Sequence, residues 1–552
     1  MPRRYELLSI LLIVAALGAC ERRKFCTAPD CGTLVDAAIG EPGTLLPAST
    51  EDITARDVAE QLFLKLADVG MSLNTVGDED FQPVLAQRWE WDGPSTLVFH
   101  IDPRARWHDG QPVTAVDVAF TFDAYTDSAV ASPFRAQLRR IASVTARDSL
   151  TAVFRFRERY PEMFYDAVYH MRVLPAHLLR SVPRDQWRTA PFGRQPIGDG
   201  PYRFVGWQAS QAIELQSDTM FFLGRPGIRR LIWRFTPDPG VAVTQLVADQ
   251  ADVREQLITP ELIERARGAQ QVKLYPYPGN TYTYVTFNLR ANGDTAKPHP
   301  IFSEREVRRA LTMAVDRASL VKSTLGEFGR VPPGPMSSLL WIWDPEIRQL
   351  PYDTTQASRH LNARGWRDHD SDGVRDKDGQ PLTFRIVVPS TSQLRRQYAR
   401  LLQEQFRRIG VQVEIDELDP RALTQRLVSG NFDAAILSRS NDPSPSSGIS
   451  QTWTSAGIGG SNYGRYSSPE FDRLVDRAIS AQSRDQSKLL WRAAIETINA
   501  DAPAIFLYAL GNVAGIHNRV DNVQIRPDSW ASLLRTWRIP HDRQIDRDRV
   551  ER

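Results

Sequence analysis

Four acidic residues in one short segment are spaced so that they could bind a metal ion. They are Asp368, Asp370, Asp372 and Asp376. Together with Gly373 they match the ligand spacing and the tight turn of a calcium-binding loop, because hard cations prefer carboxylate oxygens. The last ligand position, which should be a bidentate Glu, is occupied by Gly379. The sequence therefore leaves two interpretations open, a calcium site and a solvated acidic turn between a helix and a strand.

The first of the three cysteines suggests an exported chain. Cys20 ends a stretch of small residues that looks like a bacterial lipobox, after a basic start and an apolar stretch at 7–17. That apolar stretch is too short to cross a bilayer as an ordinary helix. The pattern predicts an export signal at residues 1–19, a lipid anchor on the Cys20 thiol and a short polar tether at residues 20–31.

The other two cysteines, Cys26 and Cys31, form a close pair in CTAPDC. An exported chain meets an oxidising compartment, where such a pair can form a disulfide. A metal site would need further ligands, and no His lies nearby. We therefore expect a small disulfide loop.

Aromatic side chains in the C-terminal half could line a ligand cleft. They are Trp341, Trp343, Trp453 and Tyr463. Such rings offer a large contact area around a few polar groups, which is what a small-molecule site needs. Each of them could equally pack in a core or an interface.

No catalytic constellation can be read from the sequence. There is no H-E-x-x-H motif, no G-x-S-x-G elbow and no P-loop, and Pro175 separates His170 from His177. The chain has 68 Lys plus Arg against 66 Asp plus Glu, interspersed rather than clustered, which argues against binding of nucleic acid. The length of 552 residues and the apolar content of 42% predict two or three globular domains. Because no catalytic motif is present, we expect no enzymatic activity.

The local patterns predict both strands and helices. Leu97, Phe99 and Ile101 alternate with polar or smaller residues as in a strand, and Thr114 with Asp117 resembles a capping box for a helix at 115–125. Other strands are expected at 33–38, 202–207, 282–288, 382–388, 411–418, 432–437 and 504–510. Further helices are expected at 56–67, 394–409, 420–429, 470–480 and 487–500, and one after a capping box at Ser303 and Glu306. This alternation is typical of an α/β fold, with a long loop at 441–465.

Separated blocks of the sequence, in order, resemble the family 5 extracellular solute-binding proteins of ABC importers, the group that contains oligopeptide-, dipeptide- and nickel-binding proteins. The blocks are FQPVLAQRWEWDG, LVFHIDPRARWHDGQPVTAVDVAFTFD, IGDGPY, FNLR with PIFSEREVRRALTMAVDR, YDTTQASRHLNARGW, DSDGVRDKDGQPLTFRIVV and NFDAA. The resemblance runs from about residue 32 to residue 527, which is nearly the whole exported chain.

The resemblance implies a bilobed Venus-flytrap fold with an extra inserted domain, built from mixed sheets with flanking helices. Carried onto this chain, lobe I comprises residues 32–55, 196–285 and 511–545, the inserted domain residues 56–195, and lobe II residues 286–510. The strands that cross between the lobes, at 284–288 and 504–510, are the expected hinge.

The implied function is capture of a small solute, most readily an oligopeptide-like one, and its delivery to an ABC permease. The resemblance implies a lipid-anchored monomer on the periplasmic side of the bacterial envelope that needs no cofactor. An alternative is an envelope sensor or peptide chaperone that uses the same fold without transport. Ligand residues are implied on three segments, namely Gly43, Thr44 and Leu45, then Ser390, and then Arg439, Asn441 and Asp442.

Peptide binders of the family hold the peptide amino group with an Asp shortly after a Trp. This chain reads LSRSNDPSPSS there, without the Trp, and Arg439 occupies roughly the acidic position. A cation at that position would favour a carboxylate or another anion through charge-assisted hydrogen bonds.

Overall fold

The computed structural model of the chain describes residues 24–28, 30–50 and 52–550. The expected export signal and Cys20 lie outside these residues. Within the described part, no helix is both long and apolar enough to cross a membrane. We keep the names lobe I, inserted domain and lobe II for the residue ranges expected from the sequence.

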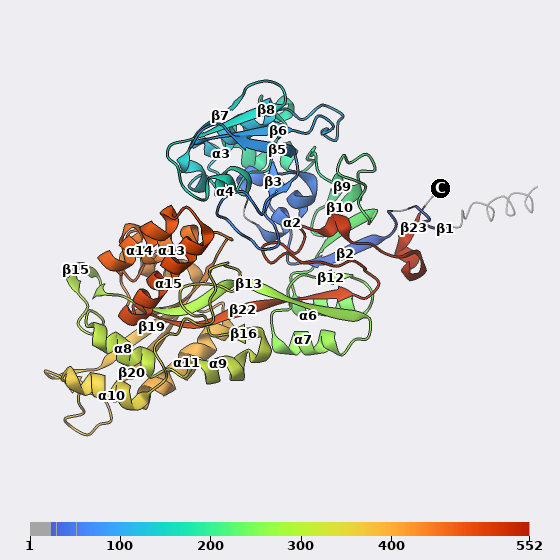
Figure 1. Cartoon of the computed structure of the whole chain (residues 1–552). Coiled ribbons are helices and arrows are strands. Elements are labelled where there is room, and N and C mark those ends of the chain that lie inside the picture. Colours follow the sequence, from blue (N-terminus) through green and yellow to red (C-terminus); the bar gives the residue numbers. More distant parts are fainter. Residues whose placement is uncertain (1–23, 29, 51, 551–552) are drawn as a thin grey trace, which may run out of the picture.

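One mixed sheet of eleven strands runs through both lobes (Figure 1). Its order is β20-β19-β21-β13-β22-β12-β2-β11-β10-β9, and β16 pairs with β22. The lobe I strands are β2 (Thr33–Ala38), β9 (Tyr202–Gln208), β10 (Ala212–Ser217), β11 (Arg230–Phe235) and β12 (Val253–Arg254). The lobe II strands are β16 (Gly329–Arg330), β19 (Thr383–Pro389), β20 (Gln412–Leu418) and β21 (Ala434–Ser440).

The two lobes are joined by a pair of long antiparallel strands, β13 (Val272–Phe287) and β22 (Ala504–His517). Both are much longer than the strands expected at 282–288 and 504–510. The first half of β13 was not predicted from the sequence because it contains Pro276 and Pro278, and proline rarely occurs inside a sheet. They are tolerated because this half of β13 pairs only with β22, so that the missing N–H groups interrupt no second ladder.

The pairing of β13 with β22 shifts register where the strands pass from one lobe to the other. Residues 272–278 pair with 511–517, residues 282–286 pair with 504–509, and the ladder is irregular between Pro278 and Tyr282. A Cβ added to Gly279 would lie 2.0 Å from the carbonyl oxygen of Leu510, so only glycine allows this close approach. The irregular step lies a few residues before the lobe boundary expected at 285.

The inserted domain carries its own four-stranded antiparallel sheet, in the order β5-β6-β8-β7. Its elements are β5 (Ala86–Trp91), β6 (Thr96–Ile101), β7 (Ile141–Ala146), β8 (Thr151–Phe156), α3 (Ala115–Thr126), α4 (Met163–Val168) and α5 (Ala176–Leu179). The expected helix at 115–125 is confirmed as α3, and the Thr114 N–H donates to the Asp117 carboxylate at 2.8 Å. The other Asp117 oxygen accepts from the Ala176 N–H at 2.9 Å, so this cap also ties α5 to α3.

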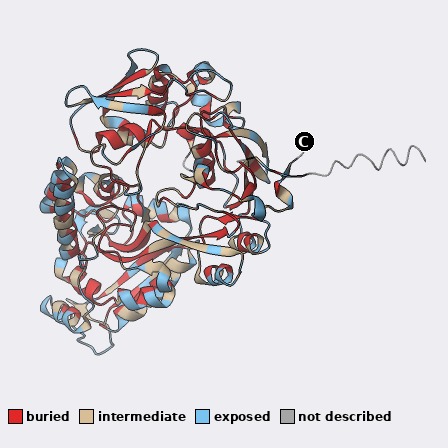
Figure 2. Cartoon of the chain, turned by 45° about the vertical axis from the view of Figure 1, so that its right-hand side comes forward, coloured by how far each residue is buried: buried red, intermediate tan, exposed pale blue. Residues whose placement is uncertain are grey.

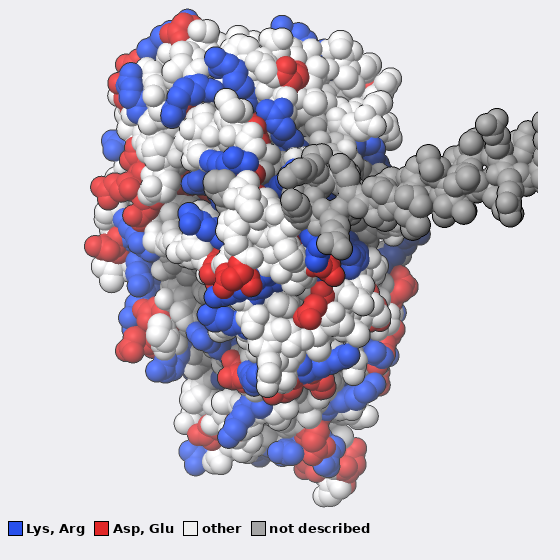
Figure 3. All heavy atoms as spheres, turned by 90° about the vertical axis from the view of Figure 1, so that its right-hand side faces the viewer, with Lys and Arg blue, Asp and Glu red and all other residues white. Residues whose placement is uncertain are grey.

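Lobe I and the inserted domain share one hydrophobic core. Leu34 and Trp233 of lobe I belong to the same buried cluster as Phe99 and Trp107 of the inserted domain. Lobe II has two clusters, one of which includes Val307 and the other Leu437. Figure 2 shows the buried residues inside each part and the exposed ones on the outer faces of the helices. On the face in Figure 3, Lys and Arg are interspersed with Asp and Glu.

The helices of lobe II flank the sheet. They are α8 (Arg305–Met313), α9 (Arg317–Thr324), α10 (Thr354–Ala363), α11 (Gln393–Arg407), α12 (Pro420–Ser429), α13 (Pro445–Trp453), α14 (Pro469–Ser480) and α15 (Arg484–Asp501). The expectation of one long loop at 441–465 was wrong, because α13 begins there with Pro445 at its first position, where the missing N–H costs nothing. The capping box at Ser303 was also wrong, since Glu304 is the N-cap and the Ser303 hydroxyl donates to the His299 carbonyl at 2.6 Å.

The described part of the expected tether is attached to the folded body. Strand β1 (Lys24–Phe25) pairs with β23 (Arg549–Val550), so lobe I continues past residue 545. Cys26 and Cys31 are buried and joined by a disulfide, with their Cα atoms 5.5 Å apart. The polar composition hid this packing, because the partner strand lies at the other end of the chain.

The segment IGDGPY, residues 197–202, contacts the C-terminal end of α2 (Ile53–Leu62). A Cβ added to Gly198 would lie 1.9 Å from the Leu62 carbonyl oxygen, and the Gly200 N–H donates to the same oxygen at 2.8 Å. Between the glycines, the Asp199 carboxylate accepts from the Leu64 N–H at 2.9 Å. These contacts fix where the chain runs after α2.

We expect Gly198→Ala to lower the free energy of unfolding by about 1 to 3 kcal/mol, the usual cost of overpacking a closely packed site. The control is Gly206→Ala in β9, where an added Cβ meets nothing within 4 Å. Denaturant and thermal unfolding at one pH would compare them. Equal midpoints for the two variants would contradict the tight packing at Gly198.

Candidate functional site: a cavity between the lobes

A cavity of about 300 Å³ lies where lobe I, the inserted domain and lobe II meet. Lobe I contributes Pro47, Thr50, Asn280, Asp528 and Ser529. The inserted domain contributes Arg56, Ala59, Glu60, Lys65, Tyr125, Phe134, Gln137, Tyr169, His170 and Arg172. Lobe II contributes Leu339, Ser440, Asn441, Asp442 and Pro443. All three parts of the chain therefore supply walls of this cavity.

The wall on the side of the inserted domain is rich in charge. Arg172 pairs with Glu60 at 3.0 Å, and Glu60 also accepts from the Ser529 hydroxyl of lobe I. Deeper in lobe I, Arg526 pairs with Asp528 at 2.6 Å, and Asp528 also accepts from the Tyr169 hydroxyl at 3.3 Å. Most acidic groups of this wall are therefore already satisfied by partners within the protein.

Lobe II presents the turn that follows β21. The Asn441 N–H donates to the Asn280 carbonyl at 2.7 Å, and the Asn441 side-chain oxygen accepts from the Ser337 N–H at 3.2 Å. One oxygen of Asp442 accepts from the Ser444 N–H at 2.9 Å and from the Ser447 hydroxyl at 2.7 Å. These bonds hold the two side chains in place at the cavity wall, and burial raises the pKa of Asp442.

Two contacts bridge the inserted domain and lobe II beside the cavity. The Glu162 carboxylate accepts from the Thr75 hydroxyl of its own domain and from the hydroxyls of Ser444 and Ser446 across the cleft. The Trp341 indole N–H donates to the Thr75 hydroxyl at 3.2 Å. The lobes therefore meet in a closed arrangement, and a carboxylate is buried at the contact.

Two of the ligand residues expected from the sequence, Asn441 and Asp442, line the cavity. Arg439 does not, because its guanidinium donates to Gln451 at 3.2 Å. Trp453 lies in the core of lobe II, where its N–H donates to the Tyr282 hydroxyl at 3.0 Å. Arg439 and Trp453, both expected as ligand residues, thus lie outside the lining of this cavity.

The remaining expected ligand residues also lie outside the cavity lining. They are Gly43, Thr44, Leu45, Trp341, Trp343, Ser390 and Tyr463. The chain that follows Leu45 does reach the cavity, through Pro47 and Thr50. Leu45 itself is buried in the core of lobe I, and its N–H donates to the Gly193 carbonyl at 2.8 Å.

Most cavity residues of the inserted domain were missed in the sequence. One signal was present, since Lys65 is a single charged residue within the apolar run LFLKLA. Lysine is rarely buried without a partner, so such a residue indicates a functional position. The polar residues His170 and Arg172, between apolar neighbours, give a weaker signal of the same kind.

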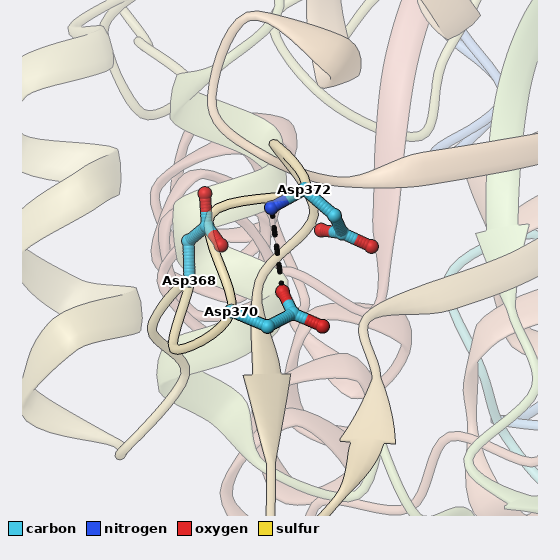
Figure 4. Close-up of side chains that lie close together, drawn as sticks. All are labelled: Asp368, Asp370 and Asp372. Carbon is cyan, nitrogen blue, oxygen red and sulfur yellow. Dashed lines mark hydrogen bonds between the residues drawn. The ribbon is translucent and has the colours of Figure 1, made fainter.

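The acidic loop brings three of its four candidate ligands together. The carboxylate oxygens of Asp368, Asp370 and Asp372 lie within 4.8 Å of one another on an exposed turn (Figure 4). They accept N–H groups of the loop itself, for example from Asp372 to Asp370 at 3.3 Å. Asp376 is not part of this group, because its carboxylate binds the backbone N–H and the ring of His369. Three of the four residues expected to bind calcium thus lie together, and Asp376 is not among them.

The sequence and the fold of this chain are similar to those of known proteins. The model of "Bacterial extracellular solute-binding proteins, family 5 Middle" matches residues 80–461. The chain is 27% identical over 549 residues to the oligopeptide-binding protein AppA of Bacillus subtilis, covering 96% of this chain and 98% of that protein. The structure of that protein with a nonapeptide is similar with a TM-score of 0.74 at 26% identity, over 93% and 100% of the two chains.

Two further relatives differ in what their names say they bind. NikZ from Campylobacter jejuni in complex with Ni(L-His) has a similar fold, with a TM-score of 0.74, 23% identity and coverage of 92% and 99%. The chain is also 24% identical over 459 residues to heme-binding protein A of Haemophilus influenzae, covering 78% of this chain and 79% of that protein. The fold therefore occurs with chemically different ligands.

We expect the buried Glu162 to make stability depend on pH. Burial, with Asp166 adding to it, raises the pKa of Glu162 from 4.5 to about 7. The protonated carboxyl is thus favoured in the folded protein, and its contribution is fully present below pH 4.5 and lost as the pH rises through about 7. The loss amounts to about 3 kcal/mol over this window.

The measurement is the difference in melting temperature between the protein and Glu162→Gln from pH 5 to pH 8. The amount by which the melting temperature of the natural protein exceeds that of Glu162→Gln should decrease as the pH rises. The control is Glu79→Gln, which changes an exposed glutamate of the same domain and should show no such trend. Asp166, His170 and Asp442 lie nearby, but both the natural protein and the variant contain them. A difference independent of pH would contradict the raised pKa.

Proposed function

This chain belongs to the bacterial extracellular solute-binding proteins of family 5, and from that premise we propose that it encloses a small peptide-like solute in the cavity between its lobes. It is a substrate-binding protein of an ABC importer and not an enzyme.

The observation that carries the proposal is the cavity at the meeting point of the three parts of the chain. Its walls combine aromatic rings, such as Tyr125 and Phe134, with charged groups of both signs. Apolar walls with a few fixed polar groups are what small-molecule sites require, and a volume of about 300 Å³ is at the small end of such sites. These features favour a solute with apolar parts and charged ends, such as a peptide of a few residues.

Opening and closing would take place at the irregular step of the β13–β22 pair. The β13–β22 ladder is interrupted at residues 279–281, opposite residue 510, and backbone change in hinge motions concentrates in few residues. We also propose that Cys20 carries the lipid anchor, which would keep the protein at the membrane beside its permease. The protein would then act as a monomer on the periplasmic side of the envelope.

We expect Asp442→Asn to weaken binding of an amine-bearing peptide by about 1 to 3 kcal/mol, because the variant keeps the shape but removes the charge. Mass spectrometry of solutes that co-purify with the protein would identify the peptide, and titration calorimetry would measure its affinity. The control is Asp476→Asn, an exposed aspartate on α14. Equal affinities of the two variants would exclude Asp442 from the binding site.

Arg439→Ala should change the affinity for the same solute less than about twofold, because its side chain lies outside the cavity lining. The same calorimetric titration tests this. A loss of about tenfold or more, the size expected for a charge-assisted contact, would return Arg439 to the ligand site.

A further inference from the structure

One ammonium group at the cavity has no partner of opposite charge in contact. Lys65 is 8% exposed, and among the described residues no hydrogen bond or ion pair involves its Nζ. The Nζ atom lies over the ring of Tyr169, 4.1 Å from its centre. Burial, with Arg172 adding to it, lowers the pKa of Lys65 to about 8. An ammonium held this way costs free energy that a bound anion would recover.

A second cation without a partner lies on the same wall. Arg56 belongs to α2 and lines the cavity, and its guanidinium makes no ion pair within the described part of the chain. Arg56 is exposed, and although burial lowers the pKa of its guanidinium, nearby acidic groups such as Asp57 and Asp528 outweigh this and raise it without forming an ion pair in the described part of the chain. Lys65 and Arg56 are therefore the cations of this wall that remain for a ligand.

The other charged groups of this wall are already paired with one another. Glu60 pairs with Arg172, and Asp528 pairs with Arg526, which also pairs with Asp68. Across the cavity, the nearest carboxylate of lobe II is Asp442. The cavity is thus positive at the Lys65 wall and carries an acidic group on the opposite wall.

We propose that Lys65 and Arg56 form a subsite for a carboxylate of the ligand. The inference rests on the proposed function in so far as the cavity is where the solute binds. A carboxylate placed between the two cations would accept charge-assisted hydrogen bonds from both, and Arg56 can bind it in bidentate fashion. The carboxylate is either the C-terminus of a peptide or a group of a small polycarboxylate, and these sources can be separated by experiment.

The IGDGPY segment positions this subsite. Gly198, Asp199 and Gly200 bind the end of α2 and the chain directly after it, through Leu62 and Leu64. Lys65 follows at the next position, so its direction into the cavity depends on those contacts. A segment that identifies the family thus also supports the side chain that we assign to the ligand.

The test compares a library of tripeptides with free C-termini, the same library amidated at the C-terminus, and citrate. Affinities are measured by calorimetry and captured peptides by mass spectrometry, for the protein and for Lys65→Met and Arg56→Gln. The matched control is Lys273→Met, because Lys273 also lies over a tyrosine ring, at 5.1 Å from Tyr275, but is exposed and outside the cavity.

The expected result is that the free peptides bind about tenfold tighter than the amides, and that Lys65→Met and Arg56→Gln each lose about 10- to 100-fold for the free peptides only. Lys273→Met should bind like the unchanged protein. Melting curves show whether each variant is folded. Equal binding of free and amidated peptides, or unchanged binding by Lys65→Met, would overturn the subsite and leave the proposed function intact.

Citrate binding that Lys65→Met abolishes, without binding of either library, would support the subsite and overturn the peptide-like solute. No binding of either library or of citrate would overturn both. A further readout is proton uptake, since an anion beside Lys65 raises its pKa, and binding at pH 8 should take up protons. Glu60, Asp68, Arg172 and Arg526 also act on Lys65, so the uptake must disappear in Lys65→Met to be assigned to it.

Discussion

The architecture depends on the antiparallel pairing of β13 with β22. Every other strand of the main sheet is added to one end of this pair or the other, so the two lobes share a continuous ladder of backbone hydrogen bonds. The ladder shifts register near Gly279, where the strands approach too closely for a side chain, and again between Thr283 and Tyr284. A connection of this kind restricts the lobes to bending and twisting about one place, and the cavity lies beside it.

Charge burial at the cleft follows from this arrangement. When the lobes meet, polar groups from the inserted domain and lobe II lose water and must find partners. The Glu162 carboxylate accepts hydrogen bonds from hydroxyl groups of lobe II, and Arg172 forms an ion pair with Glu60. The Lys65 ammonium contacts only the ring of Tyr169, which offsets the cost of its burial less than an opposite charge would. The closed protein therefore combines satisfied contacts that hold the lobes together with a few charges available to a ligand.

Much of the local structure could be predicted from the sequence. Strand β2 and helix α12 begin and end where the patterns indicate, and α3 begins after its cap at Thr114. Errors arose where distant contacts outweigh local composition. Pro276 and Pro278 occur in a strand because that part of β13 is paired on one side only. The polar segment at Lys24–Phe25 is a strand because it meets Arg549–Val550.

The sequence by itself determined the family, the bilobed class of fold and the absence of a catalytic motif, because these depend on ordered blocks and local periodicity. Of the residues expected from the sequence to contact the ligand, Asn441 and Asp442 line the cavity. Tertiary structure decided the rest, since the cavity is assembled from segments as far apart as Pro47 and Ser529. Whether a charged side chain is paired, as Arg172 is, or left for a ligand, as Lys65 is, depends on distances across the fold that local spacing does not encode.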